Sequence, residues 1–172
     1  NQGKHMPERF LTRNIPAKRE DRQTVSYETY VERGGYSTLK KSLMMSPEEV
    51  VSIVKDAELR GRGGAGFPCG VKWTFLPEPD GKTRYLCVNC DEAEPGTFKD
   101  RLLLECDPHQ LIEGMIVSAY TLQADVAYIF IRAEYHQATR LLQEAIAACH
   151  EKGYLGQDIL GTGYQLEMHV HS

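Results

Sequence analysis

The sequence lacks the apolar segments that membrane-spanning and secreted proteins carry. None of its 172 residues belong to an uninterrupted apolar run of membrane-spanning length, which is about 18 residues. The most apolar stretch, residues 111–131, is broken by Glu113, Gln123 and Asp125. The amino end also has no continuous apolar core of the kind found in signal peptides. We therefore expect a protein that is neither inserted in a membrane nor secreted.

Positive charge and paired cysteines are scarce as well. The formal net charge is −4, which argues against a nucleic-acid binder that depends on bulk electrostatic attraction. The five cysteines are an odd number and are scattered along the chain. This pattern indicates reduced thiols and a cytoplasm-like compartment rather than a disulfide framework. The sequence also contains no internal repeat and no low-complexity tract.

The composition that remains, with 41% hydrophobic and 26% charged residues, is that of an ordinary globular chain. Residues 1–45 are predicted to form an N-terminal arm with short helices, of which residues 1–23 are polar and almost without periodicity. We expect this polar part to be extended and either to wrap a neighbouring protein or to stay mobile. Residues 46–172 are predicted to form an α/β domain.

The hydrophobic periodicity predicts alternating helices and strands in this domain. The clearest helix start is Ser46, which can cap a helix with Pro47 in its first position and Glu49 completing a capping box; this helix is expected to end at Gly61. Strands 84–89 and 126–132 have the composition of buried strands, and strand 164–170 alternates as a half-exposed strand does. Helices are predicted over residues 27–33, 36–43, 46–61, 108–123 and 135–152. Strands separated by helices of this length indicate a layered fold with a mainly parallel sheet.

A glycine-rich run, residues 61–66, is the most informative segment. Four glycines in six positions remove side chains where a flat ligand or a phosphate could lie on the backbone. The run satisfies G-x-G-x-x-G, but a capped helix precedes it and Pro68 follows, whereas the dinucleotide fingerprint needs a strand before and a helix after. Phe67 replaces the lysine of a phosphate-binding P-loop. A single Arg-Gly unit beside a helix is also not a repeated RNA-binding tract, which leaves a nucleotide-type site or a plain glycine turn.

An acidic loop follows the strand that ends at Asn89. Asp91, Glu92 and Glu94 lie within four residues, before a rigid turn at Pro95-Gly96. Open α/β sheets usually bind ligands at the carboxyl ends of their strands. Ionised carboxylates can accept hydrogen bonds from ribose hydroxyls or from a flavin ring N–H. The alternative is that the three acids only form a solvated surface, although the turn favours a loop of defined shape.

Two other patterns point less clearly to a site. Cys87 and Cys90 have the C-x-x-C spacing, but there is no second pair, and positions i and i+3 of a strand face opposite sides. His169 and His171 share one strand face without an apparent third metal ligand. We therefore expect neither pair to bind a metal.

The two loops together resemble a known family. Residues 61–68, 70–73 and 89–101 are similar to the FMN-bearing, NADH-oxidising subunit of respiratory complex I (NuoF type). The similarity runs from about residue 27 to residue 172, and the two loop motifs are long enough to be highly specific. Further matching segments are residues 108–109, 112–115, 128–135, 153–156 and 169–171.

The resemblance implies a Rossmann-like variant that holds one FMN, with hydride transfer from NADH to FMN followed by single-electron transfer to iron–sulfur clusters and finally to quinone. In such a site the glycine run would give the flavin and the nicotinamide room, Phe67 and Phe75 would wall the nucleotide, and the acidic loop would hold the cofactors. Lys72 and Glu94 would be the catalytic pair, with Lys72 supplying positive charge and Glu94 standing between flavin and NADH. The implied cofactor-binding residues are Gly61, Arg62, Gly63, Gly64, Ala65, Gly66, Phe67, Lys72, Phe75, Asn89, Asp91, Glu92 and Glu94.

The resemblance also implies partners and a location. The chain would correspond to the amino-terminal portion of such a subunit, and the family's 4Fe–4S ligands lie in a later segment that this chain does not contain. Its neighbours would be the 2Fe–2S NuoE-like subunit and the large iron–sulfur NuoG-like subunit, in the peripheral arm of complex I on the cytoplasmic side of the bacterial inner membrane. Two other functions stay open: a diaphorase subunit of an NAD-dependent hydrogenase or formate dehydrogenase, and a non-catalytic scaffold without FMN.

Overall fold

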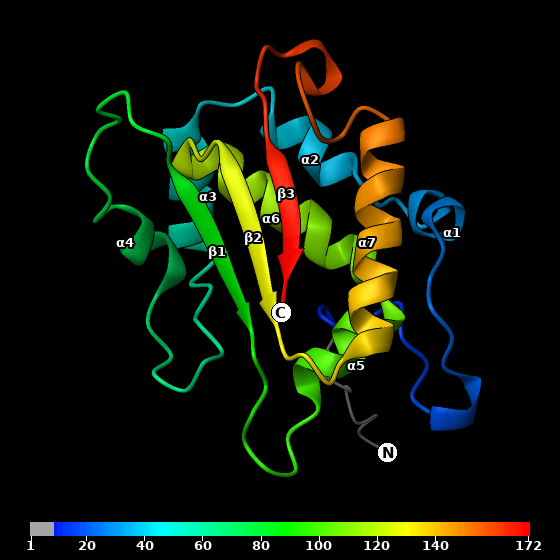
Figure 1. The fold of residues 1–172 in the computed structure, drawn as a ribbon. Coiled ribbons are helices and arrows are strands. Elements are labelled where there is room, and N and C mark those ends of the chain that lie inside the picture. The colour runs from blue at the N-terminus through cyan, green and yellow to red at the C-terminus, as the bar shows by residue number, and fades with distance from the viewer. Residues whose placement is uncertain (1–8) are drawn as a thin grey trace, which may run out of the picture.

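Three parallel strands form the centre of the protein in a computed structural model, which describes residues 9–172. The strands β1 (Tyr85–Cys90), β2 (Val126–Ile131) and β3 (Glu167–His171) lie side by side in that order. Both neighbouring pairs are parallel. The predicted α/β architecture with a parallel sheet is therefore confirmed (Figure 1).

Helices connect the strands, as parallel pairing requires. The crossover from β1 to β2 contains two helices and the crossover from β2 to β3 contains one. The α-helices are α1 (Tyr27–Glu32), α2 (Ser37–Ser42), α3 (Pro47–Asp56), α4 (Cys69–Trp73), α5 (Lys99–Cys106), α6 (Pro108–Leu122) and α7 (His136–Glu151). Short 3-10 turns occur at Arg19–Asp21 and Ile159–Gly161. All five predicted helices are present, whereas α4 and α5 were not predicted.

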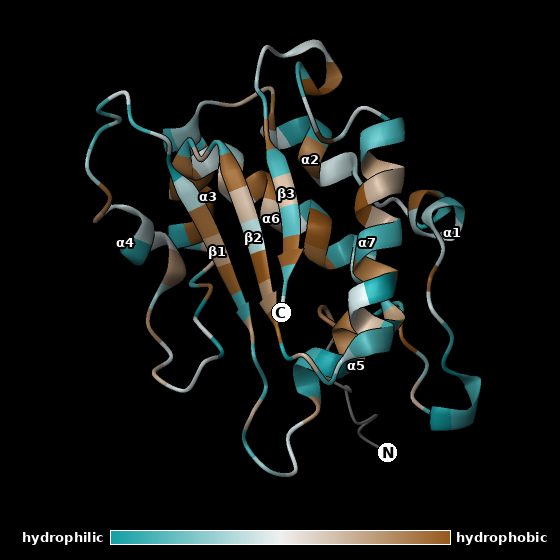
Figure 2. Ribbon diagram, in the orientation of Figure 1, coloured by the Kyte–Doolittle hydropathy of each residue, from teal (hydrophilic) through white to brown (hydrophobic). Residues whose placement is uncertain are grey.

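Among the described residues, the helices cover one face of the sheet only (Figures 1 and 2). Ala127, Ile129 and Ile131 of β2 are buried against this helical layer, while Phe130 between them is 48% exposed. Tyr85 of β1 is likewise exposed on the uncovered face. The prediction that β1 and β2 are buried strands is therefore wrong. Only one face of each strand packs against the helices, and the side chains of the other face are partly or fully exposed to solvent.

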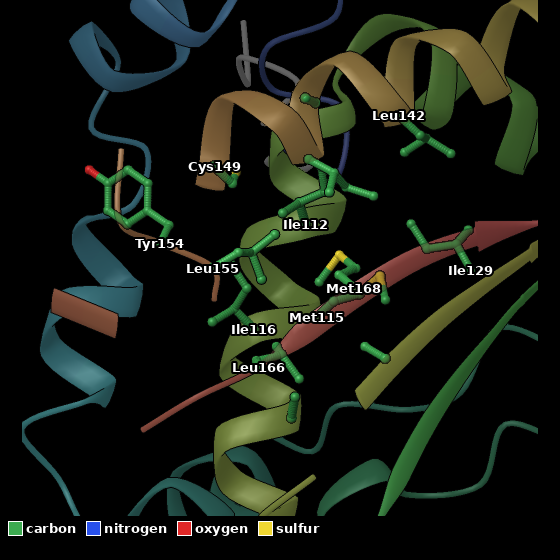
Figure 3. Close-up of a cluster of buried hydrophobic side chains, with 14 of the residues drawn as sticks. Ile112, Met115, Ile116, Ile129, Leu142, Cys149, Tyr154, Leu155, Leu166 and Met168 are labelled. Carbon is green, nitrogen blue, oxygen red and sulfur yellow. The ribbon is translucent and has the colours of Figure 1, made fainter. Parts of the chain in front are cut away.

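The core lies between the sheet and α6 (Figure 3). Ile112, Met115 and Ile116 of α6 are buried together with Ile129 of β2 and Leu142 of α7. Burying a side chain of this size contributes about 1.5–3 kcal/mol. Helix α6 contacts β2 and helices from both halves of the chain, so it lies at the centre of the packing.

The N-terminal region packs on the same core. Tyr30 and Leu39, from α1 and α2, belong to the buried cluster that includes α6. Residues 9–25 lie on the chain's own α5 and α6, where Ile15 is buried and Asn14 donates a hydrogen bond to Asp107 (2.8 Å). The expectation of an arm that wraps a neighbour or stays mobile is therefore wrong for residues 9–23. Residues 1–8 lie outside the described part of the chain.

Helix α3 begins as predicted and ends earlier than predicted. The Ser46 hydroxyl accepts a hydrogen bond from the Glu49 N–H (3.2 Å), and the Glu49 carboxylate accepts one from the Ser46 N–H (2.7 Å), so the capping box is confirmed. The helix stops at Asp56 because Glu58 adopts a left-handed conformation with φ 50°. Leu59 then leaves the helix, and its carbonyl accepts a hydrogen bond from the Cys69 N–H (2.7 Å). This is the exit into the glycine-rich run.

No helix within residues 9–172 is both long enough and apolar enough to cross a bilayer.

Candidate functional site

The glycine-rich run forms a loop that is closed at its base. Gly61 N–H donates to the Phe67 carbonyl (2.9 Å), and Arg60 pairs with Pro68 in an antiparallel bridge. The Arg60 guanidinium also donates to the Gly66 carbonyl (3.2 Å). Gly64 and Gly66 have positive φ angles of 112° and 61°, which glycine adopts without strain. These hydrogen bonds fix the base of the loop. At Gly64 and Gly66 the backbone adopts a conformation that is strained for residues other than glycine.

The backbone of this loop faces open space. A Cβ atom placed on Gly63, Gly64 or Gly66 would have no other atom within 4 Å. Glycine is therefore not required at these positions to make room for the protein's own side chains. The arrangement leaves bare peptide groups on which a planar ligand could lie.

Two hollows meet at Gly63. The first, of about 420 Å³, lies between the glycine-rich loop and the acidic loop and is lined by Arg62, Asn89, Asp91 and Glu94, among others. The second, of about 500 Å³, is lined by the rest of the glycine-rich loop together with α4 and β1. Both volumes fall within the range of about 300–1,000 Å³ that is typical of small-molecule sites. The structure thus brings together two loops that lie far apart in sequence.

The predicted aromatic and cationic residues lie at the second hollow. Phe67 lines it, and Phe75 lies beside Phe67 with 6.0 Å between ring centroids. Both residues are exposed, at 46% for Phe67 and 68% for Phe75. Lys72 and Ala65 line the same hollow. Two exposed phenyl rings next to an ammonium group form a surface suited to a flat, negatively charged ligand.

The acidic loop is shaped by its own hydrogen bonds. The Asn89 side-chain carbonyl accepts a bond from the Asp91 N–H (2.9 Å), which bends the chain where β1 ends. The Glu94 carbonyl accepts bonds from the backbone N–H and the hydroxyl of Thr97. The carboxylates of Asp91 and Glu94 remain exposed at the first hollow. They can therefore accept hydrogen bonds from a ligand.

Glu92 has a second role that the sequence did not reveal. Its side chain is 7% exposed, and its carboxylate accepts bonds from the N–H groups of Asp100 (3.1 Å) and Arg101 (3.2 Å) at the start of α5. Burial alone would raise the pKa of Glu92, but these two N–H groups and nearby Lys99 hold the pKa below its usual value. Glu92 lines the first hollow, as its predicted role requires, and it also caps α5.

Arg132 is a site-associated residue that the sequence prediction missed. It follows β2, and its guanidinium donates to the Glu92 carbonyl (2.9 Å). Only the register of the sheet, in which Cys90 lies beside Ile131, brings the two residues together. Arg132 could have been predicted from the sequence only by its position directly after β2, the strand that lies beside β1.

The cysteines lie as predicted on opposite faces of β1: Cys87 is exposed and Cys90 is buried. Across residues 9–172, no cluster of three or more His, Cys, Asp or Glu side chains is placed to hold a metal ion.

Comparison with known proteins identifies the family. The model of the Nuo51 FMN-binding domain matches residues 54–172. The chain belongs to this family. Every predicted site residue, from Gly61 to Glu94, lies within the matched range of the Nuo51 FMN-binding domain.

Curated relatives carry a consistent name. The chain is 56% identical over 144 residues to the F 2 subunit of the NADH-quinone oxidoreductase of Rhizobium meliloti, covering 83% of this chain and 34% of the relative. It is 49% identical over 156 residues to the corresponding F subunit of Escherichia coli, covering 90% of this chain and 35% of the relative. The F subunit of Aquifex aeolicus is 49% identical over 160 residues, or 92% of this chain and 37% of the relative. The chain thus spans about a third of the length of these relatives.

Solved structures support the same fold. A chain of an NAD+-reducing nickel–iron hydrogenase superposes with a TM-score of 0.61 at 38% identity, covering 76% of this chain and 22% of the hydrogenase chain. The same kind of enzyme in an air-oxidised state gives a TM-score of 0.63 at 33% identity, covering 87% of this chain and 24% of the other. The chain is therefore similar in fold to part of this hydrogenase.

Proposed function

We propose that this chain is the FMN-binding part of an NADH dehydrogenase subunit, which transfers hydride from NADH to FMN and delivers single electrons to iron–sulfur clusters. The observation that carries the proposal is Gly63. It is shared by both hollows, its missing side chain faces open space, and the exposed carboxylates of Asp91 and Glu94 stand across the first hollow. The family match and the names of the relatives support the same conclusion.

The residues present fit FMN. The bare backbone at Gly63, Gly64 and Gly66 accepts a planar ring at close approach. Asn89 and the carboxylates of the acidic loop provide acceptors for ring N–H and ribityl hydroxyl groups. Arg62, at the first hollow, provides positive charge for the phosphate. When bound, FMN supplies hydride acceptance and its conversion into single-electron steps.

The chain's own residues would bind and orient the two nucleotides. Phe67 and Phe75 would shield the nicotinamide from water and stack on it. Lys72 would attract the pyrophosphate and balance negative charge near the cofactors. Glu94 would set how NADH docks and would disfavour extra negative charge near the ring. Each of these roles concerns placement and electrostatics, because the redox chemistry belongs to the cofactors.

The same proposal includes partners and a location. The named relatives are subunits of NADH-quinone oxidoreductases, which implies a multi-subunit assembly. We infer that electrons leave to a NuoE-like 2Fe–2S subunit and a NuoG-like iron–sulfur subunit. The assembly would be the peripheral arm of complex I on the cytoplasmic side of the bacterial inner membrane.

A diaphorase subunit of an NAD-linked hydrogenase is the second candidate, favoured by the solved structures at 33–38% identity. The identity to NADH-quinone oxidoreductase subunits is higher, at 49–56%. Both candidates use the same FMN and NADH chemistry. The larger similarity therefore favours the respiratory enzyme.

The direct test is a titration of FMN with the purified chain, followed by quenching of flavin fluorescence. We expect saturable quenching. Absence of quenching at high micromolar concentrations would contradict the FMN site and favour the scaffold alternative. In the assembled enzyme that carries this domain, Glu94→Gln should change the KM for NADH or the flavin midpoint potential by removing a charge beside the cofactors. If neither quantity changes, the role of Glu94 is wrong.

A further inference from the structure

The segments that leave β1 and β2 are tied to one another. Because Cys90 lies beside Ile131 in the parallel register, the acidic loop begins next to Arg132. The Arg132 guanidinium donates a hydrogen bond through Nη1 to the Glu92 carbonyl (2.9 Å), and its Nε lies 3.9 Å from Asp91 Oδ1. One cation therefore contacts both the backbone and a carboxylate of the loop.

Glu134 orients this guanidinium. Its two carboxylate oxygens accept bonds from Arg132 Nε (3.3 Å) and Nη2 (3.1 Å). A two-point contact of this kind fixes the plane of the guanidinium as well as its position. The remaining Nη1 group is thereby directed at the Glu92 carbonyl.

Tyr135 adds a contact from the same segment. Its hydroxyl donates to the Glu92 carboxylate (3.4 Å), and the Arg101 guanidinium lies 5.5 Å from the centre of its ring. Glu92 in turn accepts bonds from the first N–H groups of α5. The segment after β2 thus holds the acidic loop at the point where the loop turns towards α5.

The three residues that follow β2 in this network do not line the hollow themselves. The residues that line the hollow between the two loops include Asn89, Asp91, Glu92 and Glu94, but not Arg132, Glu134 or Tyr135. Three acidic side chains within four residues repel one another, and nearby cations offset this repulsion. Arg62 and Lys99 line the hollow itself, whereas Arg132 contacts the loop from the segment after β2 and also bonds to its backbone.

We propose that Arg132, held in orientation by Glu134, is the positioning residue of the acidic loop and sets the affinity of the site for FMN. The inference rests on the proposed function, since it assigns the loop to FMN. Its physical basis is preorganisation: a loop already fixed in its binding shape loses less conformational freedom when the ligand binds.

The test uses four variants of the same chain. Arg132→Gln removes the charge and most of the fork, and Arg132→Lys keeps the charge without the fork. Arg140→Gln is the matched control, because Arg140 forms an exposed ion pair with Glu144 on α7 (2.9 Å) and lines neither hollow. Glu134→Gln serves if Arg132→Gln does not fold, since it loosens the guanidinium and leaves it in place.

The first measurement is hydrogen–deuterium exchange of the amides of residues 92–101, which does not depend on any ligand. We expect exchange about tenfold faster in Arg132→Gln, which loses the charged hydrogen bond, and in Arg132→Lys, whose ammonium cannot bond to Glu134 at two points and to the Glu92 carbonyl together. Exchange should increase less in Glu134→Gln and should not change in Arg140→Gln. Unchanged exchange in Arg132→Gln would overturn the positioning role. Exchange at the wild-type rate in Arg132→Lys would show that the charge alone is sufficient and that the fork of the guanidinium is not needed.

The second measurement is the Kd for FMN by fluorescence quenching. Arg132→Gln and Arg132→Lys should bind about tenfold more weakly than the wild-type chain, while Arg140→Gln should bind equally well. Faster exchange with unchanged FMN affinity would overturn the link to the ligand. If the wild-type chain itself does not bind FMN, the proposed function fails, and the exchange experiment still decides whether Arg132 positions the loop.

Discussion

Glycine serves opposite purposes in two regions of the molecule. At the junction of α1 and α2, a Cβ atom on Gly35 would collide with the ring of Tyr30, so the missing side chain makes room for the protein's own packing. In the glycine-rich loop, a Cβ atom on Gly63 would have no other atom within 4 Å. In the first region, the space left by the missing side chain is filled by another part of the protein. In the second region, that space is open to solvent. The difference separates residues that maintain the fold from residues that form the site.

The carboxylates of the two regions differ in the same way. Glu113 is 7% exposed and accepts hydrogen bonds from the Tyr30 hydroxyl (2.5 Å) and from the N–H groups of Tyr36 (2.9 Å) and Leu39 (3.0 Å). Its carboxylate therefore caps α2 from a distant helix. Glu94 is exposed at the first hollow. Substitutions in one region should affect folding stability, and those in the other should affect binding.

The largest expected effect is on Glu113. Glu113→Ala should lower the free energy of unfolding by about 3–5 kcal/mol, because it leaves one hydroxyl and two N–H groups buried without an acceptor. Urea denaturation followed by circular dichroism measures this change. Glu94→Ala is the matched control, with an expected change within about 0.5 kcal/mol. Equal effects of the two substitutions would contradict the separation of the regions.

An intermediate effect is expected at Gly35. Gly35→Ala should destabilise the protein by about 1–3 kcal/mol, because the new methyl group collides with a buried ring that cannot move freely. A lower thermal unfolding midpoint with unchanged FMN affinity per folded molecule is the expected result. An unfolding midpoint like that of the wild type would mean that the α1–α2 junction rearranges at little cost.

The smallest effect on stability, with a clear effect on binding, is expected at Gly63. Gly63→Ala should change the free energy of unfolding by no more than about 0.5 kcal/mol, since open space surrounds the new methyl group. FMN binding should weaken about tenfold, because the methyl group then stands between the backbone and the ring. Gly114→Ala is the control: it adds a methyl group to open space on α6, away from both hollows, and should leave FMN binding unchanged. A Gly63→Ala chain that binds FMN normally would remove Gly63 from the site.

Local signals in the sequence predicted the elements whose stabilising contacts are local. The capping box of Ser46 and Glu49 lies within four residues and was found directly. Helix α5 was missed because its first N–H groups are capped by Glu92, which lies outside the helix and ahead of it. The end of α3 was predicted too late in the sequence, because the residue with the left-handed conformation is Glu58 rather than a glycine.

Both loops of the site were found from sequence because each is a contiguous motif. The strand-end rule placed only the acidic loop at a ligand site. That the two loops form one site was implied by the resemblance to the family, and the structure brings both to one hollow. The sequence could not show which acidic side chains form hydrogen bonds within the protein and which remain free to bind a ligand. Glu113 acts on residues 74–83 positions away, and Arg132 reaches Glu92 across 40 positions. Such pairings depend on strand register and helix packing, which only the folded structure defines.

The docking of residues 9–25 also sets an order of events during synthesis. Val25 N–H bonds to the Cys106 carbonyl (2.8 Å), Thr24 to the Glu105 carbonyl, and Asn14 to Asp107, so each partner is made more than 80 residues later. At roughly 5–20 residues per second, a ribosome needs several seconds to reach that point. Residues 9–25 therefore leave the ribosome before α5 and the start of α6, on which they pack, have been made. During this interval a chaperone could bind them.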